Sequence, residues 1–192
     1  QGVEPKLSAE TGAAESPEVI GRTNRPETVA YGPSGDVPYS LRYRVVPLDE
    51  ITASHTERGV LRAEHDPSLQ PRDAFQIAKA TNIAQHLRPE LLLPETSLLA
   101  EGAPIVRSDN MAINNHRVVA LRIARESYPE NWRTYQDAVK VRASDLGLSA
   151  EGIKDPVLVR EVVNEAEIPT VVDLSNRRTG QAYSPSALAA ID

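Results

Sequence analysis

Three stretches of the sequence have the apolar spacing of helices. Over residues 73–87 apolar side chains recur every three or four positions until Pro89 stops the pattern, which predicts an amphipathic helix. Residues 116–127 are apolar on nearly every side, as is typical of a buried helix. Pro129 can occupy the first position of a third helix, and Gly147 lies beyond its end.

Other stretches have the alternation and β-branched residues of strands. Residues 41–46 alternate up to a proline, which predicts a strand at an edge of the sheet because proline cannot donate to a ladder. Residues 156–163 favour a central strand. Residues 103–106 and 111–113 predict two short strands joined by a hairpin, since the Asp-Asn pair between them tolerates positive φ.

The beginning of the chain has a different composition. Residues 1–38 are rich in Gly, Pro, Ser, Thr and Glu and have almost no periodic apolar pattern, so we expect a disordered linker or tail. We place the folded domain at residues 39–192. The sequence does not begin with Met, and it ends soon after the helix-start signal Ser184-Pro185, so we expect a fragment of a longer chain.

Composition narrows the classes of function. The 192 residues are 40% hydrophobic, which suffices for one domain. The absence of cysteine excludes thiol catalysis and thiolate zinc sites. A net charge of −6 argues against general coating of a DNA backbone, which needs many unpaired basic residues. No apolar run reaches the ~20 residues of a membrane helix, so we expect no membrane partner and a cytoplasmic protein of a bacterial host cell.

The segment from Asn114 to Ala120 carries the strongest candidate chemistry. It places small polar residues between a strand and a helix, where the first N–H groups of the helix have no partners within it and attract an anion. Arg117 can hold a phosphate with two parallel donors, and His116 can donate from one ring nitrogen. Asn115 can be either a helix cap or a ligand contact. By pattern alone, a capped helix with a surface arginine is somewhat the commoner explanation.

Asn115-His116-Arg117 followed by Ala120 resembles the phosphate-binding motif of the ParB/sulfiredoxin superfamily. Further segments resemble the DdrB-like ParB domains of large phage and plasmid proteins, which are mobile elements. These segments are Ile51 to His55, Leu69 to Asp73, Gly102 to Val106, Tyr128 to Tyr135 and Pro156 to Arg160. The resemblance implies an α/β (α+β) fold of the ParB/sulfiredoxin type, with a small mixed sheet and packed helices. It also implies a helix for Thr170 to Asn176, against their β-branched composition.

The motif departs from the family at two positions. Asn114 and His116 stand where the family has glycines, which moves the motif toward the Cys-His-Arg of sulfiredoxins and the His-His-Arg of free-serine kinases. Sulfiredoxin activity is excluded, because Asn115 stands where those enzymes have their reacting Cys. A phosphate site of Asn114, Asn115, His116 and Arg117 follows from the resemblance.

The resemblance also marks residues elsewhere in the chain. One is Arg72, at a helix start. In ParB clamp proteins a later Glu-Asn pair helps to hold nucleotide and metal, and its nearest match here is either Asp173 or Ser175-Asn176. His55 lies at another marked position; if the fold brings it beside His116, both become candidates for general-base catalysis or metal binding. The four histidines show no metal-ligand spacing, so the metal stays unknown.

Three functions agree with this sequence. The first is binding of a nucleoside triphosphate, CTP or ATP with Mg²⁺, with or without hydrolysis, in a phage or plasmid DNA-processing protein. The second is a ParB-like nuclease that acts on DNA. The third is a non-catalytic protein- or DNA-interaction module of a large mobile-element protein. DNA contact through neighbouring modules and a homodimer that closes on nucleotide are both allowed by the resemblance.

Overall fold

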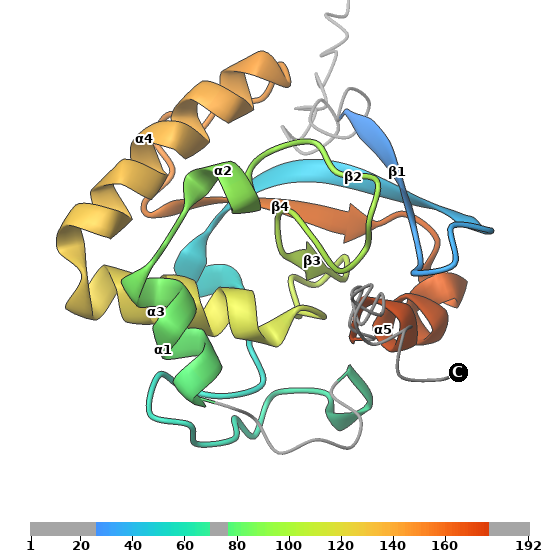
Figure 1. The fold of residues 1–192 in the computed structure, drawn as a ribbon, viewed down its shortest axis with the longest axis horizontal. Helices are drawn as coiled ribbons and strands as arrows, with labels where there is room; N and C mark the ends of the chain where they lie inside the picture. The colour runs from blue at the N-terminus through green and yellow to red at the C-terminus, as the bar shows by residue number, and fades with distance from the viewer. Residues whose placement is uncertain (1–25, 70–76, 177–192) are drawn as a thin grey trace, which may run out of the picture.

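A mixed four-stranded sheet forms the centre of the molecule (Figure 1). The computed structural model describes residues 26–69 and 77–176. The strand order is β1-β2-β4-β3; β2 pairs antiparallel with β1 and β4, and β3 pairs parallel with β4. The strands are β1 (Glu27–Tyr31), β2 (Pro38–Pro47), β3 (Ile105–Val106) and β4 (Pro156–Val162). This arrangement confirms the predicted α/β fold with a small mixed sheet.

β2 lies inside the sheet, so its predicted place at an edge is wrong. Pro47 is the last residue of β2 and stands opposite Pro156, the first residue of β4. The missing N–H groups therefore fall at the end of the ladder, where the N–H of Leu48 donates to Asp155 O at 3.0 Å instead. The prediction of a central strand at β4 is confirmed, since β4 has a partner on each side and six of its seven residues are buried.

The prediction of a disordered tail over residues 1–38 is wrong for β1, which lies within that range. Glu27 to Tyr31 pair with β2 over five residues, and Arg42 Nη2 lies 3.2 Å from Glu27 Oε1. Alternate side chains of β1 are buried, so the strand contributes to the core. A strand of this length is stabilised by its partner more than by its own composition. The polar sequence around β1 therefore did not predict a strand. Residues 1–25 lie outside the described residues.

The helices predicted before residue 177 are present, and the predicted helix start at Ser184-Pro185 lies outside the described residues. Figure 1 shows α1 and α3 at the lower left of the view, α4 at the upper left and α5 at the lower right. The α-helices are α1 (Ile77–Gln85), α2 (Pro89–Leu92), α3 (Asn115–Ser127), α4 (Pro129–Asp145) and α5 (Ile168–Asn176), and short 3₁₀ helices are η2 (Leu48–Glu50), η3 (Pro67–Leu69) and η4 (Glu165–Glu167). The helix that the resemblance implied for residues 170–176 is thus confirmed, whereas residues 73–76 of the first predicted helix lie outside the described residues.

Two apolar clusters hold these elements together. The larger one joins α1, α3 and α4 to β2 and β4, and residues 118–124 of α3 are all buried, as predicted. The smaller one joins α5 to β1, β2 and the segment before α3 through Ile113, Val171 and Val172. None of the helices within residues 26–69 and 77–176 is long and apolar enough to cross a membrane.

The predicted hairpin before α3 is also present. Arg107 N donates to Met111 O, Asn110 has a φ of 64°, and Val106 bridges Ala112 in antiparallel fashion. Its second half is an isolated bridge rather than a full strand. The hairpin brings the chain back beside β3 just before α3 begins, which fixes the position of the Asn115-His116-Arg117 turn.

Candidate functional site

Two buried asparagines fix the beginning of α3. Asn114 Oδ1 accepts from the N–H of Ile105 at 2.8 Å, and Asn115 Oδ1 accepts from the N–H of Ser54 at 2.6 Å. Asn114, at the N-cap position, makes no side-chain cap bond, and Asn115 is the first residue of the helix and serves another loop. The helix-cap alternative for Asn115 is therefore wrong. Each side chain still has an NH₂ group through which phosphate contact stays a prediction.

Arg117 reaches back from the first turn of α3 to a loop that precedes β3. Its Nη2 donates to Ala100 O, and its Nη1 donates to Glu101 O at 3.4 Å. Burial lowers the pKa of Arg117 to about 10, and the Glu101 carboxylate acts in the opposite direction. The side chain therefore stays charged at neutral pH. These two bonds use two of its five N–H groups, so three remain for a ligand.

A second guanidinium holds the same loop. Arg160 is 0% exposed, and its donors reach the carbonyl oxygens of Leu98, Leu99, Glu101 and Ala103. We call residues 98–103 the carbonyl loop. Burial, followed by the positive charge of Arg117, lowers the pKa of Arg160 to about 9. Two cationic side chains therefore lie close together at the carbonyl loop, and both bind the carbonyl of Glu101.

Arg117 and Arg160 are set apart by their shared carbonyl partner and by the lack of an ion pair. Six arginines among the described residues form ion pairs with carboxylates; Arg117 and Arg160 form none, and neither does the half-buried Arg142, but only these two meet at one carbonyl, that of Glu101. The paired ones are Arg42, Arg44, Arg62, Arg107, Arg122 and Arg125. Carbonyl groups satisfy donors but carry no net charge, and the Glu101 carboxylate acts on both arginines without forming an ion pair, so the two positive charges are only partly compensated within the part of the chain that the structure describes.

The structure brings His55 and His116 into electrostatic contact, as the catalytic prediction required. Burial, and then the charges of Lys79 and His55, lower the pKa of His116 to about 4. Burial also lowers the pKa of His55, whose Nδ1 lies 2.9 Å from Ser54 Oγ. Both imidazoles are therefore neutral at neutral pH. A catalytic role for either one stays a prediction.

His65 joins the same neighbourhood. It is 5% exposed, and neither ring nitrogen has a hydrogen-bond partner among the described residues. Burial is the main cause that lowers its pKa, Asp66 opposes the shift, and His55 adds to it. Three histidines thus lie near the start of α3. Even so, the described residues contain no group of three or more His, Cys, Asp or Glu placed to hold a metal ion.

Two further predicted residues are not placed by the structure. Arg72 lies outside the described residues. Asn176 is the last residue of α5, and its side chain is likewise not described. α5 packs in the same apolar cluster as Ile113, two residues before α3, and Figure 1 shows α5 beyond the end of α3 that follows β3. The later helix therefore lies on the side where α3 begins, as the resemblance implied.

Sequence reasoning missed two of the cations at this site. Lys79 is exposed on α1, and its charge acts on His116. Arg160 was recognised only as part of a strand. A charged residue within an otherwise apolar central strand was the available signal, because such a residue is buried only when its donors have partners.

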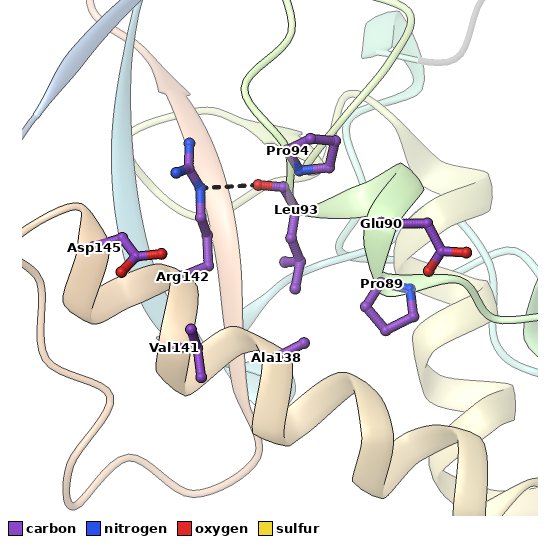
Figure 2. Close-up of a pocket in the computed structure, with 8 residues that line it drawn as sticks. All are labelled: Pro89, Glu90, Leu93, Pro94, Ala138, Val141, Arg142 and Asp145. Carbon is purple, nitrogen blue, oxygen red and sulfur yellow. Dashed lines mark hydrogen bonds between the residues drawn. The ribbon is translucent and has the colours of Figure 1, made fainter.

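A hollow on the surface lies elsewhere. Figure 2 shows it between α2 and α4, where Leu93, Ala138 and Val141 line its apolar part and Arg142 Nε donates to Leu93 O at 3.0 Å. Its volume is about 420 Å³. None of the predicted site residues lines it.

The fold and this site define a mixed α/β domain whose buried helix begins on a His-Arg turn beside a second arginine. The chain belongs to the ddrB-like ParB superfamily domain family, whose profile matches residues 34–163. The match includes His55, the start of α3 and Arg160, whereas β1 and α5 lie outside it. Neither the curated proteins nor the solved structures gave a match.

Proposed function

We propose that this domain binds the phosphate group of a nucleotide at the beginning of α3. Arg117 supplies the principal donors, and His116 and the NH₂ groups of Asn114 and Asn115 border the same end of the helix. The positive end of the α3 dipole adds to the attraction of an anion there, while the N–H of Arg117 itself donates to Asn114 O at 3.2 Å.

The observation that carries the proposal is the unbalanced charge of Arg117. Its bonds go to Ala100 O and Glu101 O, it forms no ion pair with a carboxylate among the described residues, and the Glu101 carboxylate that attracts it also acts on Arg160. A buried or half-buried arginine is ordinarily paired, because removing its charge from water is unfavourable unless an anion compensates. A phosphate would supply that anion and could accept two parallel N–H bonds.

Titration calorimetry tests the proposal on the full chain with CTP and ATP, with and without Mg²⁺. Bound Mg²⁺ would be held largely by phosphate oxygens, as is common for this ion. We expect binding by the wild type and a loss of at least about tenfold in affinity for Arg117→Ala, since a charge-assisted hydrogen bond contributes about 1.5–3 kcal/mol. Arg125→Ala is the matched control, because Arg125 lies two turns later on α3 and pairs with Asp49 and Asp155. No binding of either nucleotide would refute the proposal.

The contact between His55 and His116 favours a second candidate, hydrolysis of a phosphate ester or of DNA. Both imidazoles are neutral at neutral pH, as a general base must be, and Ser54 Oγ lies within hydrogen-bond distance of His55 Nδ1, where it can orient the ring. Release of phosphate from CTP or ATP, and nicking of supercoiled plasmid, would each be measured for the wild type and His55→Ala. Turnover that survives in His55→Ala would exclude this residue as the base. Nucleotide binding without turnover would leave a binding module.

A further inference from the structure

Arg160 is placed to organise the anion site without touching the ligand. It stands in the middle of β4, opposite Tyr43 on β2 and Ile105 on β3, so strands on both sides fix its backbone. Its hydrogen bonds to the carbonyl loop use four of the five N–H groups of a guanidinium. Arg160 therefore has almost no donor left for a ligand, in contrast to Arg117.

The carbonyl loop connects the two arginines. The carbonyl of Glu101 accepts from both, and the carbonyl of Ala100 accepts from Arg117 alone. Gly102, with a φ of 71°, lets the loop lie against the guanidinium: a Cβ there would be 3.7 Å from Arg160 Cζ and 2.5 Å from Thr96 Cγ2. The position of Arg117 thus depends on a loop that Arg160 holds.

The charges at the loop do not cancel within the described residues. The one carboxylate on the loop belongs to Glu101, which is exposed and accepts from Thr96 Oγ1 at 3.3 Å rather than from either arginine. The Glu101 carboxylate offsets one of the two guanidinium charges, and the positive end of α3 adds about half a charge, so a net positive charge of about 1.5 faces this region. A terminal phosphate carries a charge of about −1.5 to −2 at neutral pH, whereas each phosphodiester carries about −1. Charge balance favours the terminal phosphate.

We propose that Arg160 is the positioning residue of the anion site, holding the carbonyl loop so that Arg117 keeps its remaining donors for a ligand, and that the two arginines together select a terminal phosphate over a phosphodiester. The inference rests on the proposed function for its ligand. Its positioning part concerns Arg117 alone and can be tested without any ligand.

Arg160→Lys tests the positioning part, because lysine keeps the charge but has a single nitrogen that cannot reach four carbonyls. In ¹⁵N NMR of the free full chain at low temperature, with the Arg117 Nη–H signals assigned through Arg117→Lys, we expect exchange with water to be at least about tenfold faster in Arg160→Lys, because these are the groups that bind the carbonyl loop. Arg44→Lys is the control, since Arg44 lies on β2 and pairs with Glu161 at 2.8 Å. An Arg117 signal that does not change in Arg160→Lys overturns the positioning role.

Selectivity is tested with CMP and its phosphate methyl ester, which differ by one methyl group and one unit of charge. At about pH 8, where CMP is a dianion, we expect the wild type to bind CMP at least about tenfold more tightly than the ester. In Arg160→Lys we expect both affinities to fall while the preference remains. Equal affinities for the two probes overturn the selectivity. A wild type that binds CTP but neither probe overturns the selectivity alone, and one that binds none of CTP, ATP and the two probes refutes the proposed function as well; an Arg117 signal that responds to Arg160→Lys supports the positioning role in either case.

Discussion

The N–H of Ser54 donates to Asn115 Oδ1 at 2.6 Å, so the first residue of α3 is tied to the residue that precedes His55. Ser54 is 0% exposed and Asn115 is 4% exposed, which shields this bond from water. The bond directly links the turn at which α3 begins to the segment that carries His55. Asn115 therefore stabilises the fold independently of any ligand.

Asn115→Ala should destabilise the domain. The substitution leaves a buried N–H at Ser54 without its acceptor, and such a group costs about 1–3 kcal/mol. Urea unfolding followed by circular dichroism would measure the change in the free energy of unfolding. Asn82→Ala on the exposed side of α1 is the control, with an expected change within about 0.5 kcal/mol. An equal, small effect for both variants would show that the bond contributes little.

The helices and the central strand could be predicted because their signals are local. The apolar residues of α3 and the proline that opens α4 lie within the segments that they shape, and the Asp-Asn turn lies within its own hairpin. β1 could not be predicted, because a five-residue strand in a polar context depends on its pairing with β2. The same holds for the position of β2, whose proline indicated an edge until the register with Pro156 was known.

The site was predictable only in its contiguous part. His116 and Arg117 follow each other in the sequence, and the resemblance marked both. Arg160 lies 43 residues beyond Arg117 in the numbering, and its link to Arg117 arises only because β4 pairs with β3 and the carbonyl loop crosses its side chain. Lys79 reaches His116 only because α1 packs against α3.

Gly102→Ala should destabilise the carbonyl loop more than a glycine substitution at an open position. Gly102 has a φ of 71°, and an added Cβ would lie 2.5 Å from Thr96 Cγ2. Gly147→Ala is the matched control, because Gly147 has a φ of 69° and nothing within 4 Å of the added Cβ. We expect about 1 kcal/mol for Gly147→Ala from backbone strain alone and about 2–4 kcal/mol for Gly102→Ala. If urea unfolding gave the same loss of unfolding free energy for both variants, the carbonyl loop would be able to shift and accommodate the methyl group.

His65→Leu should make the domain less sensitive to acid. Burial is the main cause that lowers the pKa of His65, so below the ordinary value of about 6.5 the unfolded chain binds a proton that the folded one resists. Stability is therefore full above about pH 6.5 and falls as the pH decreases. A leucine side chain cannot bind that proton in the unfolded chain. The substitution also removes two buried ring nitrogens that lack partners among the described residues.

The measurement is the free energy of unfolding at about pH 7.5 and about pH 5. We expect His65→Leu to match or exceed the wild type at the higher pH and to lose less stability at the lower one. His86→Leu is the control, because His86 is exposed on the chain just after α1. A loss of stability on acidification as large in His65→Leu as in the wild type would assign the acid sensitivity to other groups.

Binding of an anion at the start of α3 should take up a proton at His116. Burial and the charges of Lys79 and His55 hold the pKa of the free His116 at about 4, and a nearby dianion would raise it by favouring the imidazolium. Affinity should therefore increase as the pH falls from about 7.5 to about 5, by about tenfold for each unit of pKa that the anion restores within that range.

Sulfate is the suitable probe, because it stays a dianion throughout and any pH dependence then comes from the protein. In His116→Gln the slope should largely disappear while binding through Arg117 remains, and His86→Gln should keep the wild-type slope. A slope that is unchanged in His116→Gln would place the proton on another group, of which His55 is the nearest on electrostatic grounds.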